Sequence, residues 1–245
     1  RAQQLTLPSL RGILYGGAPM PRPTLDLAMA TLPGVRLFQG YGSTEALIIS
    51  MLPPEFHALD EAHRAVLRSA GLPLAGVLLS IRDAEGNELP RGAVGEICVR
   101  SNAVMQGYWR QPELTARTIV DNWLHTGDAG YLDERGFLFI VDRVKDMVIS
   151  GGENVYPKEV ENALLTCAHV DECAVIGLPH DVWGEVVHAV VRLKEGAELD
   201  AAQLASHCRA LIAGYKVPKS YEFCGDQLPR TPAGKIDKAS LRKAR

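Results

Sequence analysis

Residues that suit phosphate and cation binding follow a glycine-bearing turn early in the chain. Thr44 and Glu45 come directly after the run GYGS at residues 40–43. At the end of a strand, the Thr44 hydroxyl would suit a phosphate and the Glu45 carboxylate a divalent cation. The ordinary alternative is a helix start, with Ser43 or Thr44 as its cap and Glu45 in its first turn. On these residues alone, the helix start is the favoured interpretation.

A second polar stretch runs from residue 125 to residue 161 and contains a predicted hairpin. Asp128 follows a threonine and a glycine, and its carboxylate can accept hydrogen bonds from the hydroxyls of a sugar. Arg143 can donate to the same sugar or to a phosphate. The hairpin should hold Asp128 and Arg143 near one another, and a plain salt bridge between them is an equally good interpretation.

Two further features of the second half suit ligand chemistry. Lys235 follows a glycine in the loop LPRTPAGK, where an ammonium can reach negative charge that develops on a phosphate or carboxylate. A solvated loop lysine is the common alternative. Gly151 and Gly152 let the backbone approach an extended ligand closely, although a turn from strand to helix requires the same glycines.

The elements that must position the early residues alternate between strand and helix. Residues 10–15 predict a strand, residues 25–32 a helix and residues 35–38 a second strand, and each strand ends in a glycine-bearing turn as in α/β ligand sites. From residue 76 the pattern changes to that of antiparallel strands, at residues 77–82 and 95–100. This middle part predicts a small sheet or barrel.

The later elements predict a separate α+β domain. The hairpin pairs residues 129–132 with residues 137–141, and Gly136 in its turn suits a positive φ. After Lys145 the pattern is strand, helix, strand, strand, helix, at residues 147–149, 157–165, 172–176, 186–193 and 201–213, and Gly214 is expected to end the last helix. The expected fold class is therefore α/β plus α+β.

Two domains are expected from this order of elements. Residues 1–144 form the first, with an α/β remnant at 1–70 and an antiparallel, barrel-like β-rich part at 71–144. Residues 145–245 form the second, compact α+β domain.

Composition argues against several classes of protein. The formal net charge is −3, from 26 Lys and Arg against 29 Asp and Glu, so the chain lacks the basic footprint of a nucleic-acid-binding protein. No apolar run approaches the ~20 residues of a membrane span. The 5 cysteines show no CxxC spacing and the 7 histidines no paired ligand spacing, which argues against a zinc site or a disulfide framework and favours a cytoplasmic protein. The large aromatic residues Tyr108, Trp109 and Trp123 are interpreted as packing residues.

Five segments in one order resemble the AMP-forming acyl-CoA synthetases of the adenylate-forming family, which includes luciferases and the adenylation domains of peptide synthetases. The segments are YGGAP at 15–19, GYGSTEA at 40–46, TGD at 126–128, DRVKDMVISGGENVYPKEVE at 142–161 and PRTPAGKIDK at 229–238. They extend over nearly the whole chain.

The resemblance implies a role for each candidate residue. The residues bordering adenine would be Gly17, Ala18, Pro19 and Tyr41. Thr44 would contact phosphate and Glu45 would help to hold magnesium, while Asp128 and Arg143 would bind the ribose hydroxyls. Lys145 would be the hinge to a mobile small domain, Lys235 would assist acyl-adenylate formation, and Gly151 and Gly152 would approach the pantetheine arm of CoA.

The implied activity is that of a cytoplasmic ligase using ATP, Mg²⁺ and CoA. A carboxylate would attack the α-phosphorus of ATP to form an acyl-AMP, and the CoA thiol would then displace AMP. The segments SGGENVYP and GLPHDVWGE resemble the CoA-using branch, with fatty or aryl acids as substrates and a place in fatty acid metabolism. The alternatives are a carrier-protein-dependent adenylation domain and a non-catalytic module that binds nucleotide or a partner.

The chain departs from the family in one respect. The Ser/Thr/Gly-rich phosphate loop that precedes Pro-Lys in the family does not occur in this sequence. The chain is therefore expected to be the C-terminal part of a longer enzyme and to be inactive in adenylation by itself. Residues 5–51 should then expose a broken sheet that favours association with another segment or chain.

Overall fold

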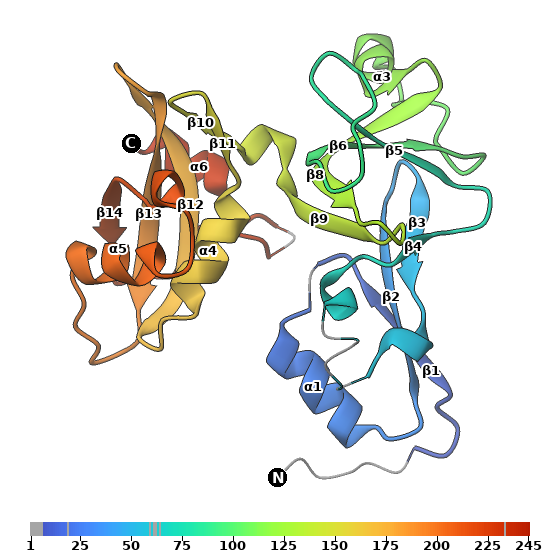
Figure 1. Cartoon of the computed structure of the whole chain (residues 1–245), viewed down its shortest axis with the longest axis horizontal. Helices are drawn as coiled ribbons and strands as arrows, with labels where there is room; N and C mark the ends of the chain where they lie inside the picture. The colour runs from blue at the N-terminus through green and yellow to red at the C-terminus, as the bar shows by residue number, and fades with distance from the viewer. Residues whose placement is uncertain (1–6, 19, 59, 61–62, 64, 233) are drawn as a thin grey trace. The chain divides into compact units, whose positions relative to one another are not determined.

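The computed structural model describes residues 7–18, 20–58, 60, 63, 65–232 and 234–245. The chain divides into two compact units, Arg1–Ile140 and Val141–Arg245, each with its own core (Figure 1). The predicted fold class, α/β plus α+β, is confirmed. The predicted domain bounds, 1–144 and 145–245, stay predictions.

The first unit begins with the predicted strand, helix and strand. β1 (Gly12–Gly16) pairs in parallel with β2 (Arg36–Ser43), and α1 (Arg22–Thr31) connects them. α1 starts with prolines, which suit the first helical turn because their missing N–H has no partner there. β3 (Leu47–Leu52) then pairs antiparallel with β2, and β4 (Leu72–Pro73) pairs with β3.

The helix start that the sequence favoured at residues 43–45 is wrong. β2 continues through the glycine run, and a turn leads directly into β3, with Gly42 opposite Ile48 and Ser43 opposite Leu47. A Cβ added at Gly42 would lie 1.8 Å from the Leu47 carbonyl oxygen. Only glycine permits so close an approach of two backbones, so the ladder extends where local sequence signals suggested a cap.

α1 covers one face of this sheet, and the other face is partly open to solvent. Leu25 of α1 is buried against Leu37 and Leu52. On the open side, Leu14 is 55% exposed and Leu47 is 65% exposed. Two short 3₁₀ turns, Pro54–Phe56 and Val66–Arg68, lie in the connection between β3 and β4 of this sheet.

The middle of the chain forms the predicted antiparallel sheet. Its strands are β5 (Leu78–Arg82), β6 (Gly95–Arg100), β7 (Ile119–Val120), β8 (Trp123–Leu132) and β9 (Leu138–Arg143), and α3 (Pro112–Thr118) precedes β7. The order is β5-β6-β8-β7, with β9 paired to β8. Ala46, in the turn before β3, and Ile49 of β3 join Ile97, Leu124 and Leu138 in one buried cluster, which fixes the two sheets of the first unit together.

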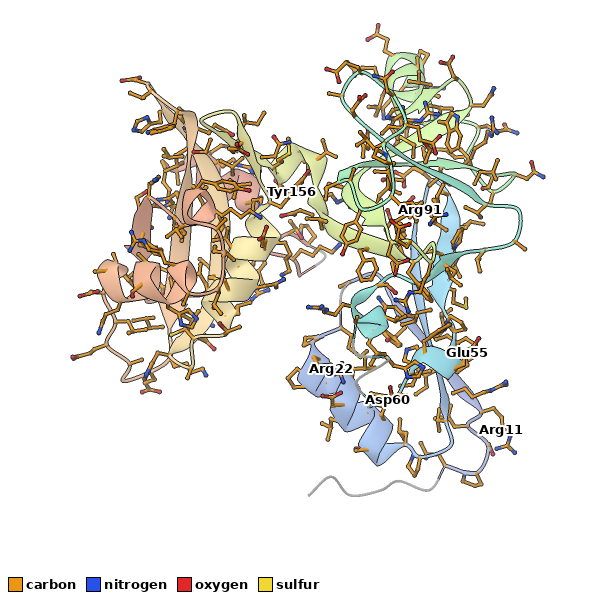
Figure 2. All side chains as sticks on the ribbon, viewed as in Figure 1. Arg11, Arg22, Glu55, Asp60, Arg91 and Tyr156 are labelled. Atoms are coloured by element: carbon orange, nitrogen blue, oxygen red, sulfur yellow. The ribbon has the colours of Figure 1, made fainter. Side chains whose placement is uncertain are left out.

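The predicted hairpin turn between β8 and β9 is confirmed. Gly136 has a φ of 86°. The Asp133 carboxylate accepts hydrogen bonds from the N–H groups of Arg135 at 3.0 Å and Phe137 at 2.8 Å. Arg91, labelled in Figure 2, donates to the Asp133 carbonyl at 2.7 Å and holds the turn from outside.

The second unit contains the predicted strands and helices in their predicted order, together with two strands, β11 and β14, that the sequence did not predict. Its elements are η3 (Val144–Asp146), β10 (Val148–Ser150), β11 (Glu153–Val155), α4 (Pro157–Leu165), β12 (Val170–His180), β13 (Gly184–Leu193), α5 (Ala201–Arg209), η4 (Gly214–Lys216), β14 (Ser220–Phe223) and α6 (Lys238–Lys243). The sheet order is β11-β10-β13-β12, and β14 lies parallel to β13. α4 has the predicted bounds.

The predicted end of the last long helix at Gly214 is wrong. α5 ends at Arg209, and Leu211 and Ile212 both donate their N–H groups to the Cys208 carbonyl. The Leu211 bond spans three residues, as in a tightened last turn of a helix, and Gly214 begins the short η4 helix.

Both faces of the second sheet are covered. α4 and α5 pack on one face through residues such as Val160, Leu164 and Leu204. On the other face, Leu228 and Leu241 pack against Ile176. The C-terminal segment is therefore part of this core.

None of the described helices is long and apolar enough to span a membrane. Within the part of the chain that the structure describes, the cysteines are free thiols, and burial raises the pKa of Cys98 and of Cys173 to about 12.

Replacement of Gly71 by Ala should strongly destabilise the first unit. Gly71 has a φ of 86°, and an added Cβ would lie 2.0 Å from the Met51 carbonyl carbon. The free energy of unfolding should fall by about 3 kcal/mol or more, because backbone must shift. Gly76→Ala is the matched control, since its φ is 82° with no atom within 4 Å of the added Cβ. The control should lose only ~1–2 kcal/mol. Equal losses in urea unfolding would contradict the steric argument.

Candidate active site

A hollow of about 540 Å³ lies where the parallel strands β1 and β2 end. Parallel strands place their carboxyl ends at one edge, so the turns that follow them meet there. The structure brings the predicted residues Gly17, Tyr41 and Thr44 together in the lining of this hollow. Ala18 follows Gly17 as an exposed residue, and Pro19 lies outside the described residues.

Tyr41 and Asp128 connect the two sheets of the first unit. The Tyr41 hydroxyl, at the end of β2, donates to Asp128 Oδ2 on β8 at 2.7 Å. The Asp128 N–H donates to Thr126 Oγ1 at 3.1 Å, and the Thr126 hydroxyl donates to the Ile97 carbonyl at 2.8 Å. Residues 87 positions apart in the chain therefore form one polar cluster, in which an aromatic ring lies beside a carboxylate.

Glu96 holds the turn that precedes Asp128. One carboxylate oxygen accepts from the Gly127 N–H at 3.0 Å, and the other lies 2.7 Å from His125 Nδ1. Cys98 Sγ lies 3.6 Å from the same nitrogen. These three side chains group atoms that metal ions bind. Burial and the Glu96 charge raise the pKa of the Cys98 thiol to about 12, and the Glu96 hydrogen bond to the Gly127 N–H supports the turn.

Tyr108 contacts Glu45 and was missed as a site residue from the sequence. Its hydroxyl donates to Glu45 Oε1 at 2.9 Å, and the Met105 N–H donates to the Glu45 carbonyl at 2.7 Å. Burial and then the Glu45 hydrogen bond raise the Tyr108 pKa. The hydroxyl therefore remains a donor at neutral pH and orients the carboxylate. No local pattern signals this pair, because 63 positions separate the two residues.

The packing interpretation is wrong for Trp109, whose exposed fraction is 83%. Its neighbour Arg110 lies over the ring at 5.5 Å from the centroid. Trp123 instead lies between Arg82 and Arg100, at 4.6 Å and 4.9 Å from its centroid. Cation–π contacts of this kind stabilise a partly exposed aromatic ring at the start of β8.

The remaining predicted residues belong to the second unit. Arg143 ends β9, and Lys145 is exposed in η3. Because Asp128 belongs to the first unit and Arg143 to the second, both their predicted proximity and the alternative salt bridge stay predictions. Lys235 is exposed and follows Gly234, which has a φ of 79°.

The glycine pair forms the tight turn between β10 and β11. Gly151 and Gly152 have φ values of 61° and 84°, which glycine adopts without strain. The Gly151 N–H donates to the Trp183 carbonyl at 2.9 Å, and an added Cβ would lie 2.5 Å from the Trp183 ring. The turn is thus packed against the tip of the β12–β13 hairpin.

Two carboxylates attach the segment around Lys145 to the second unit. Asp142 Oδ2 accepts from the Lys158 N–H in the first turn of α4 at 2.6 Å. Asp146 Oδ1 accepts from Arg242 of α6 at 3.0 Å. Lys145 therefore lies on a short segment with an anchor on each side.

Two family descriptions match this sequence. Residues 1–109 match "AMP-binding enzyme", and residues 159–235 match "AMP-binding enzyme C-terminal domain". The chain belongs to the AMP-binding enzyme family. Both matches include predicted site residues of this family, Tyr41 and Thr44 in the first and Lys235 in the second.

The names of similar proteins, and a similar solved structure, agree with the assignment of the chain to this family. A feruloyl-CoA synthase of Amycolatopsis sp is 46% identical over 99% of this chain and 48% of its own length. A fatty acid–[acyl-carrier-protein] ligase of Streptomyces coeruleorubidus is 43% identical over 96% of this chain and 44% of its own length. An o-succinylbenzoate CoA synthetase from Bacillus subtilis, solved with the acyl-adenylate intermediate OSB-AMP, has a TM-score of 0.85 and 36% identity over 100% of this chain and 48% of that chain. The chain thus spans about half the length of these relatives.

The Tyr41–Asp128 hydrogen bond should appear as an energetic coupling. A double-mutant cycle of Tyr41→Phe and Asp128→Asn should give a coupling energy of about 1–2 kcal/mol in the free energy of unfolding, because a hydrogen bond to a charged group is lost. Tyr15→Phe with Asp128→Asn is the control, since the Tyr15 hydroxyl contacts His57 at 2.9 Å. A Tyr41 coupling no larger than the control would show that the bond does not connect the sheets.

Proposed function

We propose that this chain is part of an ATP-dependent acid–thiol ligase, which activates a carboxylic acid as acyl-AMP and transfers the acyl group to CoA. The observation that carries the proposal is the hydrogen bond between Tyr41 and Asp128 at the edge that also bears Gly17 and Thr44. An aromatic ring suits a purine, a carboxylate suits ribose hydroxyls, and a hydroxyl suits a phosphate.

In this proposal the nucleotide is bound mainly by the first unit. Gly17, Ala18, Pro19 and Tyr41 would border adenine. Asp128 and Arg143 would bind the ribose hydroxyls, and Thr44 would donate to a phosphate oxygen. The backbones of β1 and β2 approach closely at Gly16, where an added Cβ would lie 2.3 Å from the Gly40 carbonyl oxygen. This close approach supports a flat binding edge.

Glu45 would hold Mg²⁺ together with phosphate oxygens. The fit is chemical: a carboxylate next to the exposed Thr44 hydroxyl supplies the oxygen ligands that Mg²⁺ prefers, and Tyr108 orients the carboxylate. When bound, Mg²⁺ would offset charge on the phosphate oxygens. The Lys235 ammonium would stabilise the charge that develops as the acid's carboxylate oxygen bonds to the α-phosphorus and pyrophosphate departs.

We propose a fatty or aryl acid as substrate and CoA as acceptor. The similarity to a feruloyl-CoA synthase supports an aryl acid and CoA, and the exposed turn at Gly151 and Gly152 would let a thin thiol-bearing arm approach. A carrier protein is the second candidate acceptor, because a relative at 43% identity is named as a carrier-protein ligase.

We also propose that the chain needs a second polypeptide segment for adenylation. Its sequence has no Ser/Thr/Gly-rich loop followed by Pro-Lys, and the described residues of the first sheet leave Leu14 and Leu47 exposed on one face. Leu14 lies on β1, which pairs in parallel with β2, and parallel strands are usually covered on both faces. Such a segment would supply the phosphate loop and cover this face.

Pyrophosphate exchange tests the proposed activity. The chain alone should give no acid-dependent exchange, and adding the half of a feruloyl-CoA synthase that the chain does not match should restore it. Lys235→Ala should then lower exchange by about 10²–10³-fold, as loss of a charge-stabilising donor does. Thioester formation with CoA and not with a carrier protein would support the first acceptor. Exchange by the chain alone would refute the need for a second segment, and nucleotide binding without exchange in any mixture would indicate a non-catalytic module.

Lys145→Pro tests the proposed hinge in the same two-piece enzyme. Because both flanks of Lys145 are attached to the second unit, rotation there would require the Asp142–Lys158 hydrogen bond to open. Proline restricts its own φ and the residue before it, so this rotation should be hindered. Thioester formation from preformed acyl-AMP should fall about tenfold or more, while adenylation changes little, because only the second step would need the rotated domain. Lys145→Ala is the control for loss of the side chain. Equal losses in both half-reactions would count against a hinge.

A further inference from the structure

The loop that carries Lys235 is a closed hairpin with its own hydrogen bonds. Arg230 and Ile236 form a β-bridge. The Thr231 N–H donates to the Lys235 carbonyl at 2.7 Å, and the Gly234 N–H donates to the Thr231 carbonyl at 2.8 Å. Lys235 thus follows a turn whose described residues are joined by hydrogen bonds, and the position of that turn depends on the contacts of its first residues.

The Arg230 guanidinium connects this turn to the sheet. Nη1 donates to the Gly234 carbonyl at 3.0 Å, directly before Lys235, and Nη2 donates to Glu172 Oε2 at 2.6 Å. Glu172 lies on β12, and its other oxygen accepts from the Leu228 N–H at 3.1 Å. One carboxylate therefore binds the chain at the start of the loop and, through Arg230, at its end.

A plain surface ion pair is the ordinary interpretation of this contact. Arg230 has a side-chain exposure of 44%, and exposed pairs contribute little to stability. The Glu172 side chain, however, is only 10% exposed, and a buried carboxylate requires its hydrogen-bond donors. The guanidinium also binds two different elements with two nitrogens. The contact is therefore suited to set geometry more than stability.

We propose that Arg230 and Glu172 form a positioning pair that sets the place of Lys235 for acyl-adenylate formation. The inference rests on the role proposed above for Lys235. Neither residue touches the reacting atoms. Arginine is required because its planar fork donates in two directions at once, whereas a lysine at position 230 keeps the charge and loses the bridge.

Hydrogen exchange in the 245-residue chain tests the structural half of the proposal. Arg230→Lys and Glu172→Gln should each raise the exchange rates of the Thr231 and Gly234 amides about tenfold, because the local opening of the turn becomes easier. Amides in the middle of β12 and β13 should keep their rates. Lys216→Gln is the matched control, since it removes a 2.7 Å ion pair with Glu159 in the same unit. Unchanged loop exchange in both variants would overturn the proposal.

The two half-reactions test the functional half in the two-piece enzyme. Arg230→Lys should lower pyrophosphate exchange by roughly 10–100-fold, as a misplacement of about 1 Å does, and leave thioester formation from preformed acyl-AMP unchanged. An equal loss in both half-reactions would indicate a merely structural role and overturn the proposal. Unchanged pyrophosphate exchange in Arg230→Lys would also overturn the proposal if Lys235→Ala lowers that exchange. If Lys235→Ala itself has no effect, the proposed role of Lys235 fails, and the loop-exchange result alone decides whether the pair positions the turn.

Discussion

The hydrogen bond from Tyr41 to Asp128 is the constraint on which the arrangement of the first unit depends. It requires β2 and β8, from two different sheets, to present these residues at one place, and the shared apolar cluster of Ala46, Ile49 and Ile97 holds the sheets in that relation. A slip of β2 by one residue would turn Tyr41 to the opposite face. The close approach at Gly42 specifies the register, so a glycine without side-chain chemistry decides where the polar groups lie.

Features with a local physical cause were predictable from the sequence. The hairpin turn at Gly136, the start of α4 at Pro157 and the strand–helix–strand order at the beginning all follow from φ preferences or periodicity, and the structure has them. The turn after Gly42 was not predictable in this way. Its ladder depends on β3, which pairs with β2 only after the chain has reversed, and local signals favour a helix cap there.

The contacts that orient side chains were beyond sequence reasoning for a related reason. Tyr108 and Glu45, or Arg230 and Glu172, are separated by 63 and 58 positions, and neither spacing has a periodic signature. Candidate site residues can be recognised in the sequence by their type and by neighbouring glycines. Those that hold them in place are ordinary tyrosines, arginines and glutamates, whose importance depends on strand pairing.

Buried carboxylates bind residues on both sides of Lys235 in the second unit. Glu172 binds Arg230 before Lys235, and Glu161 binds Lys238 after it at 2.8 Å. Glu161 also accepts from the Val175 N–H at 3.0 Å, so it joins α4, β12 and α6. Buried charges are costly unless they are paired. Here both buried carboxylates pair with cations of one nine-residue segment, from Arg230 to Lys238.

The position of the C-terminal segment in the core also has a consequence for protein synthesis. Leu228 and Leu241 cover a sheet face that includes Ile176 and Val190, and β14 joins β13 only after α5 has been made. These residues are made after the strands that they cover, so the nascent second unit exposes one apolar face until residues 228–241 have left the ribosome. A premature stop after residue 227 would leave that face open permanently, and the shortened product would be a substrate for chaperones and proteases.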